Sequence, residues 1–150
     1  MIIDTALLDT LSAQAKASPR LRMNLDLRNS PEDSSQRMLN ALEPGTVLPI
    51  HRHLRSSETV VILRGRIQWI FYDDAGSETE RVTLDADGPL RMLVVEQGRW
   101  HSLLCLDPGS VLFESKDGKY EPLGAGEVME GGRLRVRGCI PLCQIMFKQS

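Results

Sequence analysis

The sequence predicts an all-β fold, a jelly roll of two packed sheets preceded by one short α-helix. From residue 36 to residue 115, short apolar runs recur, and clusters of Gly, Pro or Asp separate most of them. Helical periodicity is confined to the N-terminal residues. Many short strands at near-regular spacing are typical of double-sheet jelly rolls. A chain of 150 residues with 41% hydrophobic residues has the size of one globular domain.

The first expected element is a helix that ends near Ala17. Asp4 is the predicted N-cap, and Leu8, Leu11 and Ala15 form one apolar stripe at helical spacing. Because proline disfavours helical conformation in the residue before it, Ser18-Pro19 ends the helix.

Apart from a single helical turn at residues 29–33, all later elements are expected to be strands. The first spans residues 20 to 27, and the others span 36–42, 46–51, 58–64, 66–73, 80–84, 90–95, 101–106 and 110–115. Turn sequences such as Asp107-Pro108-Gly109 separate them, since proline fixes φ and glycine tolerates positive φ. We therefore divide the chain into an N-terminal helix with a lead-in strand (1–35), a barrel (36–130) and a strand-like extension (131–150).

Composition excludes several classes of protein. A net charge of −2 gives no electrostatic case for nucleic-acid binding, and the alternating Arg133, Arg135 and Arg137 are interpreted as one solvated strand face. Neither a signal peptide nor an apolar stretch near 20 residues is visible, so we expect a cytoplasmic protein without a membrane segment. Three cysteines argue against a disulfide framework, and Cys139 and Cys143 are interpreted as unpaired thiols.

The three histidines of the chain are placed where one metal ion would need them. His51 and His53 are two residues apart, so on an extended strand both side chains project to the same face. Glu58 opens the apolar strand that follows, which can carry its carboxylate beside the histidine pair. His101 is the third imidazole. No other histidine occurs in the chain.

This stretch resembles the first motif of the cupin superfamily. Five residues separate Gly45 from His51-x-His53, four separate His53 from Glu58, and six separate Glu58 from Gly65, which ends the motif. Every defined position of the motif is present. The resemblance implies the cupin double-stranded β-helix as the form of the jelly roll.

The second cupin motif is matched in part. Gly98 and His101 occupy their positions, whereas Glu96 and Cys105 stand where the family has proline and asparagine. Neither departure falls on a metal ligand of the family. The resemblance implies four ligands: His51, His53, Glu58 and His101.

Four further segments resemble the WbuC-type cupin-fold metalloproteins. They are residues 23–27, 36–45, 64–66 and 113–122, and the resemblance covers residues 5 to 125. That family is associated with bacterial O-antigen and surface-polysaccharide gene clusters, and its activity is not established. Residues 131–150 show no family pattern.

Three imidazoles and one carboxylate suit one divalent transition metal, which we expect to be Zn, Ni, Fe, Co or Mn. Zinc with four protein ligands tends toward a closed structural site. An octahedral ion keeps exchangeable positions for water or substrate and can act as a Lewis acid.

Five other polar residues match positions typical of the family and are candidates for the pocket around the ion. Gln36, Arg37 and Lys116 are expected to bind an anionic substrate, because lysine and arginine pair with carboxylate or phosphate groups. Glu114 and Tyr120 are the acid–base candidates. The alternative is that these residues are exposed strand residues or one structural Glu–Lys pair.

Three functional hypotheses follow. The first is a metal-dependent isomerase, epimerase or hydrolase acting on a small anionic, sugar-related metabolite in surface-polysaccharide biosynthesis. The second is a non-catalytic metal-containing module that binds or senses a ligand, and the third is a non-haem iron oxygenase acting on a small acid. Because jelly-roll sheets expose edge strands, we also expect a homodimer.

Overall fold

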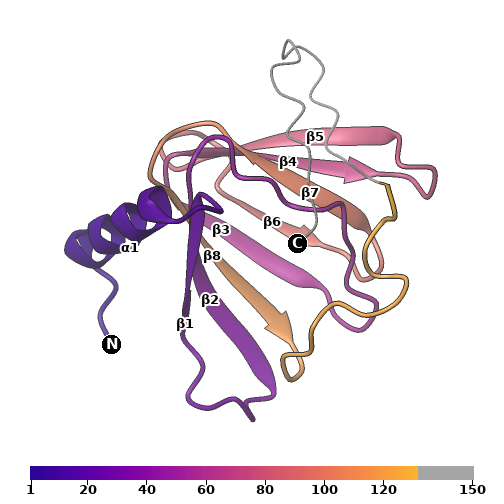
Figure 1. Cartoon of the computed structure of the whole chain (residues 1–150), viewed down its shortest axis with the longest axis horizontal. Coiled ribbons are helices and arrows are strands. Elements are labelled where there is room, and N and C mark those ends of the chain that lie inside the picture. The colour runs from indigo at the N-terminus through magenta and orange to yellow at the C-terminus, as the bar shows by residue number, and fades with distance from the viewer. Residues whose placement is uncertain (132–150) are drawn as a thin grey trace, which may run out of the picture.

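The computed structural model describes residues 1–131, and in this part of the chain eight strands form two antiparallel sheets with one helix beside them (Figure 1). The five-stranded sheet has the order β1-β2-β8-β3-β6, and the three-stranded sheet has the order β5-β4-β7. The elements are α1 (Thr5–Ala17), β1 (Arg22–Asp26), β2 (Ser35–Leu42), β3 (Glu58–Arg64), β4 (Arg66–Tyr72), β5 (Glu78–Asp85), β6 (Met92–Val95), β7 (Trp100–Cys105) and β8 (Ser110–Asp117). This architecture confirms the predicted all-β jelly roll with an N-terminal helix.

Helix α1 forms where the sequence predicts it. The backbone N–H of Leu7 donates to the Asp4 carboxylate over 2.9 Å, so the N-cap is confirmed. Leu11 and Ala15 are buried and belong to one apolar cluster with Leu39 of β2 and Val111 of β8. The helix therefore covers the outer face of the five-stranded sheet, away from the space between the sheets.

The main core lies between the two sheets. Alternate residues of β3, β4 and β7 point inward, as period-two strands with one buried face require. Its fully buried members include Val60, Ile67, Trp69, Leu84, Leu103 and Leu112. This packed layer supports the end of the sandwich at which the histidines lie.

One predicted strand is wrong. Residues 46–51 form no regular strand, and only His51 makes an isolated bridge, to His101 and to Val128. Pro49 lies in this segment and has no N–H to donate to a ladder. The other predicted strands are present, with ends that differ by no more than two residues.

The chain after β8 returns along the histidine segment. We call residues 118–131 the return segment. In Figure 1 it runs, orange to yellow, beside the connection between β2 and β3. Met129 N donates to Ile50 O over 2.9 Å, and Arg52 N donates to Glu127 O over 3.0 Å.

The predicted C-terminal extension falls, beyond Gly131, outside the described residues, as do Arg133, Arg135, Arg137, Cys139 and Cys143. Among residues 1–131, no helix is long and apolar enough to cross a bilayer.

Candidate metal centre

The four predicted ligands come from three separate parts of the chain. His101 lies on β7, and a pair of backbone hydrogen bonds of 2.9 and 2.8 Å couples it to His51. His53 follows in the connection to β3, and Glu58 is the first residue of that strand. One ring nitrogen from each histidine lies within 4.8 Å of the other two. The fold therefore brings the three imidazoles to one point.

The carboxylate of Glu58 joins the histidines. Its Oε2 atom lies 3.4 Å from His53 Nε2 and 3.3 Å from His101 Nε2. The side chain of Glu58 is 3% exposed and that of His101 is 1% exposed. The structure thus groups the three imidazoles and places the Glu58 carboxylate beside two of them.

Three buried atoms at this point have no hydrogen-bond partner among the described residues. They are His53 Nε2, His101 Nε2 and Glu58 Oε2. Buried polar atoms are nearly always paired, because leaving one unpaired costs about 1–3 kcal/mol. Three unpaired atoms that face one another are the arrangement a metal ion would satisfy. The residues present therefore fit a divalent transition metal, as the sequence predicted, without identifying which one.

Backbone carbonyls orient two of the imidazoles. His51 Nδ1 lies 3.1 Å from Pro49 O, and His101 Nδ1 lies 2.9 Å from Arg99 O. A carbonyl only accepts, so Nδ1 carries a proton in both rings, and Nε2 is the ring nitrogen left to face an ion. Burial, with a contribution from His101, lowers the pKa of His51 to about 4. This imidazole is therefore neutral at neutral pH, the form that binds metals.

Glu58 is ionised. Burial alone would raise its pKa, but His101, His53 and the Lys116 ammonium face the carboxylate and hold its pKa well below the usual range. Lys116 Nζ lies 3.8 Å from Glu58 Oε1. The centre therefore offers an anionic oxygen beside the imidazole nitrogens.

The register of β2, β8 and β3 places predicted pocket residues beside Glu58. On β8, Lys116 pairs with Gln36 of β2 on one side and with Glu58 of β3 on the other. Glu114 shares the inward face of β8 and accepts a hydrogen bond from Lys116 Nζ. Asn40 Nδ2 donates to Glu114 Oε2 over 3.0 Å. An acid and a cation thus lie directly beside the candidate ligand.

The pKa values of Glu114 and Lys116 are both raised, which favours the neutral form of Glu114 and the charged form of Lys116. Burial raises the pKa of Glu114 to about 8, the Glu58 carboxylate adds to the rise, and Lys116 opposes it. Burial would lower the pKa of Lys116, but the charges of Glu58 and Glu114 outweigh burial and raise it. At neutral pH, Lys116 is therefore charged, and Glu114 is a protonated acid.

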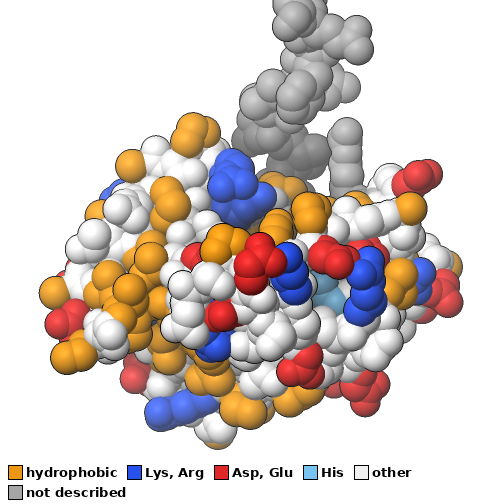
Figure 2. All heavy atoms as spheres, turned by 90° about the horizontal axis from the view of Figure 1, so that it is seen from below, with side chains coloured by type: hydrophobic (Ala, Val, Ile, Leu, Met, Phe, Trp, Pro, Cys, Tyr) orange, Lys and Arg blue, Asp and Glu red, His pale blue; other side chains and the backbone are white. Residues whose placement is uncertain are grey.

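A cavity of about 540 Å³ opens onto this group. His51, His53, Gln36, Asn40, Glu114, Lys116 and Tyr120 line it, together with Arg20, Arg22, Asn24, Asp26 and Arg28 from β1 and its flanks. Figure 2 shows the histidine side chains in a recess between basic and acidic side chains. Tyr120 is 51% exposed, and the Arg28 guanidinium lies 5.5 Å from its ring centroid. Four of the five predicted pocket residues thus line one cavity.

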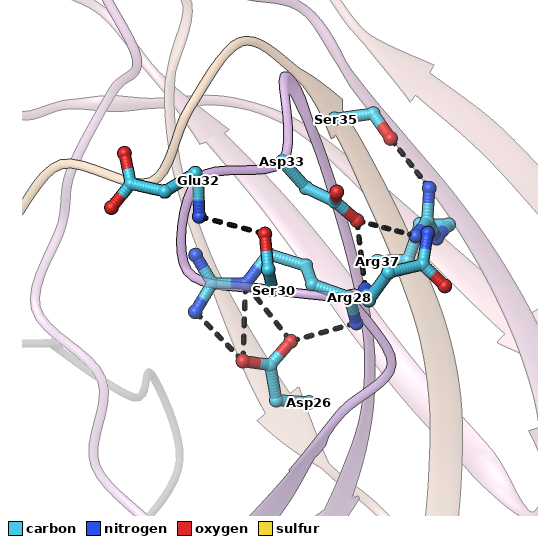
Figure 3. A network of polar contacts seen from close by, with 8 residues as sticks. Asp26, Arg28, Ser30, Glu32, Asp33, Ser35 and Arg37 are labelled. Atoms are coloured by element: carbon cyan, nitrogen blue, oxygen red, sulfur yellow. Dashed lines mark hydrogen bonds and ion pairs between the residues drawn. The ribbon is translucent and has the colours of Figure 1, made fainter.

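The structure does not bring Arg37 to this cavity. Arg37 donates to the Asp33 carboxylate over 2.9 Å and to the Ser35 hydroxyl over 2.7 Å, in a network that also contains Arg28 and Asp26 (Figure 3). The physical reason is strand parity. Gln36 faces the cavity, so its neighbour on β2 faces the other side.

Sequence reasoning missed Asn40 and the polar residues of β1. Asn40 has the same strand parity as Gln36, so alternation on β2 was a signal that could have identified it. Nothing local marks Asn24, Arg22 or Arg28. They reach the cavity only because β1 pairs with β2 at the sheet edge.

The two sheets and the helix have the cupin fold, with three histidines grouped at one end. Solved structures of similar fold include a cupin 2 domain-containing protein from Halorhodospira halophila, which is 17% identical, with a TM-score of 0.51 over 64% of this chain and 63% of that one. A family model described as "Domain of unknown function (DUF6016)" matches residues 3–84, more than half of the chain. The chain belongs to this family. No curated protein matches it.

Two other solved structures share the fold. KdgF from Halomonas sp. is 16% identical, with a TM-score of 0.54 over 69% of this chain and 84% of that one. An oxalate oxidase in complex with the substrate analogue glycolate is 15% identical, with a TM-score of 0.55 over 70% of this chain and 55% of that one. The chain thus spans little more than half of the oxalate oxidase. At these identities, the likeness is one of fold.

Proposed function

We propose that this chain is a metal-dependent enzyme acting on a small anionic, sugar-related metabolite. One observation carries the proposal. The three unpaired buried atoms of His53, Glu58 and His101 lie where a cavity of about 540 Å³ meets a buried cation and a buried acid. A closed structural site would need no such cavity. A cavity of this volume is within the range of small-molecule sites.

The residues around the candidate ion have distinct tasks in this proposal. A bound metal would supply Lewis acidity, polarising an oxygen of the substrate. Lys116, charged and 9% exposed, would attract the anionic group into the cavity. Arg28 at the cavity wall adds a second cation, although Asp26 pairs with it.

Glu114 is the better acid–base candidate. With its pKa raised to about 8, it holds a proton at neutral pH and can give it to a substrate oxygen or take one back. Asn40 and Lys116 hold its two carboxyl oxygens in place. Tyr120 lines the cavity at a more exposed position and is the second candidate.

The sugar-related part of the proposal has separate support. Amide side chains recognise hydroxyl groups as both donors and acceptors, and Asn24, Gln36 and Asn40 all line the cavity. The resemblance to WbuC-type proteins links such a substrate to surface-polysaccharide biosynthesis. We propose isomerisation, epimerisation or hydrolysis as the reaction class.

The test combines metal analysis with ligand screening. Protein purified without oxygen should contain about one equivalent of a transition metal by plasma mass spectrometry, and His53→Ala should contain almost none. In the metal-loaded protein, anionic sugars should raise the melting temperature. Lys116→Gln should abolish this rise, whereas Arg37→Gln, on the opposite strand face, should retain it.

Two results would contradict the proposal. Equal metal content in wild type and His53→Ala would show that the ion does not bind at His53. An unchanged anion response in Lys116→Gln would show that Lys116 does not bind the anion. A ligand that stabilises the protein but is never turned over would favour the non-catalytic binding module.

Oxidation of a small acid is the second candidate. It is favoured by the three-histidine, one-glutamate set together with the fold shared with an oxalate oxidase that binds glycolate. Oxygen consumption with a panel of small carboxylic acids, measured on iron- and manganese-loaded protein, distinguishes it from the first proposal.

A further inference from the structure

The segment that carries His51 and His53 is not held by a sheet. His51 makes isolated bridges, and residues 52–57 belong to no strand. Among the described residues, none hydrogen-bonds to Nδ1 of His53, whereas backbone carbonyls orient the rings of His51 and His101. The position of His53 therefore depends on how its backbone is held.

One residue of the return segment holds the backbone on both sides of His53. The carbonyl oxygen of Glu127 accepts from Arg52 N over 3.0 Å. Its side-chain Oε1 accepts from Leu54 N over 3.0 Å, and Oε2 accepts from Gly124 N over 2.8 Å. The donors at Leu54 and Gly124 lower the pKa of Glu127, so the carboxylate is ionised and its hydrogen bonds are charge-assisted.

The side chain of Arg52 also holds the return segment against residues 52–54. Its Nε donates to Gly126 O over 2.9 Å, and its guanidinium lies 4.2 Å from the centroid of the Trp100 ring. Trp100 is adjacent to His101 on β7 and donates to Asp74 over 3.0 Å. The return segment is thereby tied to the strand that carries the third histidine.

We infer that Glu127 is a positioning residue for the candidate metal centre, which fixes the backbone around His53 so that His53 Nε2 faces Glu58 and His101. The inference rests on the proposed metal binding and goes beyond it, because Glu127 lies outside the cupin motifs. Groups that orient metal ligands typically change metal affinity about 10- to 100-fold when they are removed.

The experiment measures Co²⁺ binding by the full-length chain. Glu127→Ala removes both carboxylate contacts, whereas Glu127→Gln keeps one acceptor oxygen and places an amide N–H₂ where the second oxygen was. The affinity for Co²⁺ should fall about 10- to 100-fold in the alanine variant and by less in the glutamine variant. The d–d absorption spectrum should change as well, because it reports the geometry of the bound ligands. Glu130→Ala, an exposed position on the same segment, is the matched control.

A second measurement separates positioning from general stability. Melting of the metal-free protein in chelator should change little in Glu127→Gln, while its Co²⁺ spectrum differs from that of wild type. Wild-type affinity and spectrum in both variants would overturn the inference and leave the metal centre intact. Equal losses in Glu130→Ala would also overturn it. A wild-type chain that binds no Co²⁺ or other transition metal would overturn both the inference and the proposed function.

Discussion

Two buried glutamates on neighbouring strands hold opposite protonation states. Glu58 faces two imidazoles and Lys116, so its pKa lies well below the usual range. Burial raises the pKa of Glu114 to about 8, and the negative charge of Glu58 adds to the rise, while Lys116 opposes it. Environments that push two carboxyl pKa values apart assign their roles, one as an anionic ligand and one as a proton donor.

The first prediction concerns the pH dependence of stability caused by Glu114. Its pKa is 4.5 ordinarily and about 8 in the folded chain, so the folded state binds more protons than the unfolded state between these values. Stability therefore falls as pH rises through this window. Glu114→Gln removes this effect, so its free energy of unfolding relative to wild type should increase from pH 5 to pH 8.

Urea denaturation of the metal-free protein at several pH values measures this difference. Thr79→Ala, at an exposed position on β5 that does not titrate, is the control and should show a constant difference. A difference that stays constant in Glu114→Gln as well would show that Glu114 titrates normally.

At the scale of elements, two of the motif glycines, Gly65 and Gly98, both have positive φ but have different surroundings. Gly65 joins β3 to β4 with φ of 75°, and Gly98 precedes β7 with φ of 79°. A Cβ at Gly65 would lie 2.3 Å from Ser110 Oγ and 3.1 Å from Ser110 Cα. At Gly98 nothing lies within 4 Å. Gly65 is therefore required by its conformation and by the close approach of β8.

We predict that alanine at Gly65 and at Gly98 will separate the cost of the left-handed backbone from the cost of the close approach of Ser110. Gly98→Ala should cost about 1–2 kcal/mol of unfolding free energy, the penalty of a left-handed conformation. Gly65→Ala should cost more, because the backbone of Ser110 must also move. Urea unfolding of both variants gives the comparison, and equal losses would show that the contact with Ser110 is relieved without cost.

At the scale of the whole molecule, one end of the larger sheet remains apolar and exposed. β6 is an edge strand of the five-stranded sheet, and its Met92 and Val94 are 51% and 52% exposed. Leu63 on the adjacent β3 is 39% exposed. Helix α1 packs mainly on β1, β2 and β8, and Arg64 at the end of β3 pairs with its Asp9. Adjacent exposed apolar side chains at a sheet edge are typical of protein–protein contacts.

The homodimer therefore stays a prediction, now with a defined surface. Light scattering should give twice the chain mass of 16.8 kDa, and Val94→Lys should shift the mass toward the monomer. Lys16→Ala on the helix surface is a control that should leave the dimer intact. A monomeric wild type at about 100 µM, well above the dissociation constants of stable dimers, would contradict the prediction.

The sequence by itself determined the helix, the turns and every strand except that at residues 46–51, and its resemblance to the cupin motifs supplied the four candidate ligands. The elements and the first motif depend on local sequence. Asp4 caps its own helix, and the spacing from His51 to Glu58 is set within one short stretch. Strand parity can also be read from the sequence. It places the side chains of Gln36 and Arg37 on opposite faces of one strand, so both could not line the same cavity.

Only the tertiary structure decided what surrounds the ligands. The pairing of β8 between β2 and β3 places Lys116 between Gln36 and Glu58, residues far apart in the chain. The hydrogen bonds from Arg52 and Leu54 to Glu127 likewise join segments about 75 residues apart. Such contacts depend on strand order and register. Side-chain periodicity specifies which face of a strand is buried, but it does not specify which strand lies beside it.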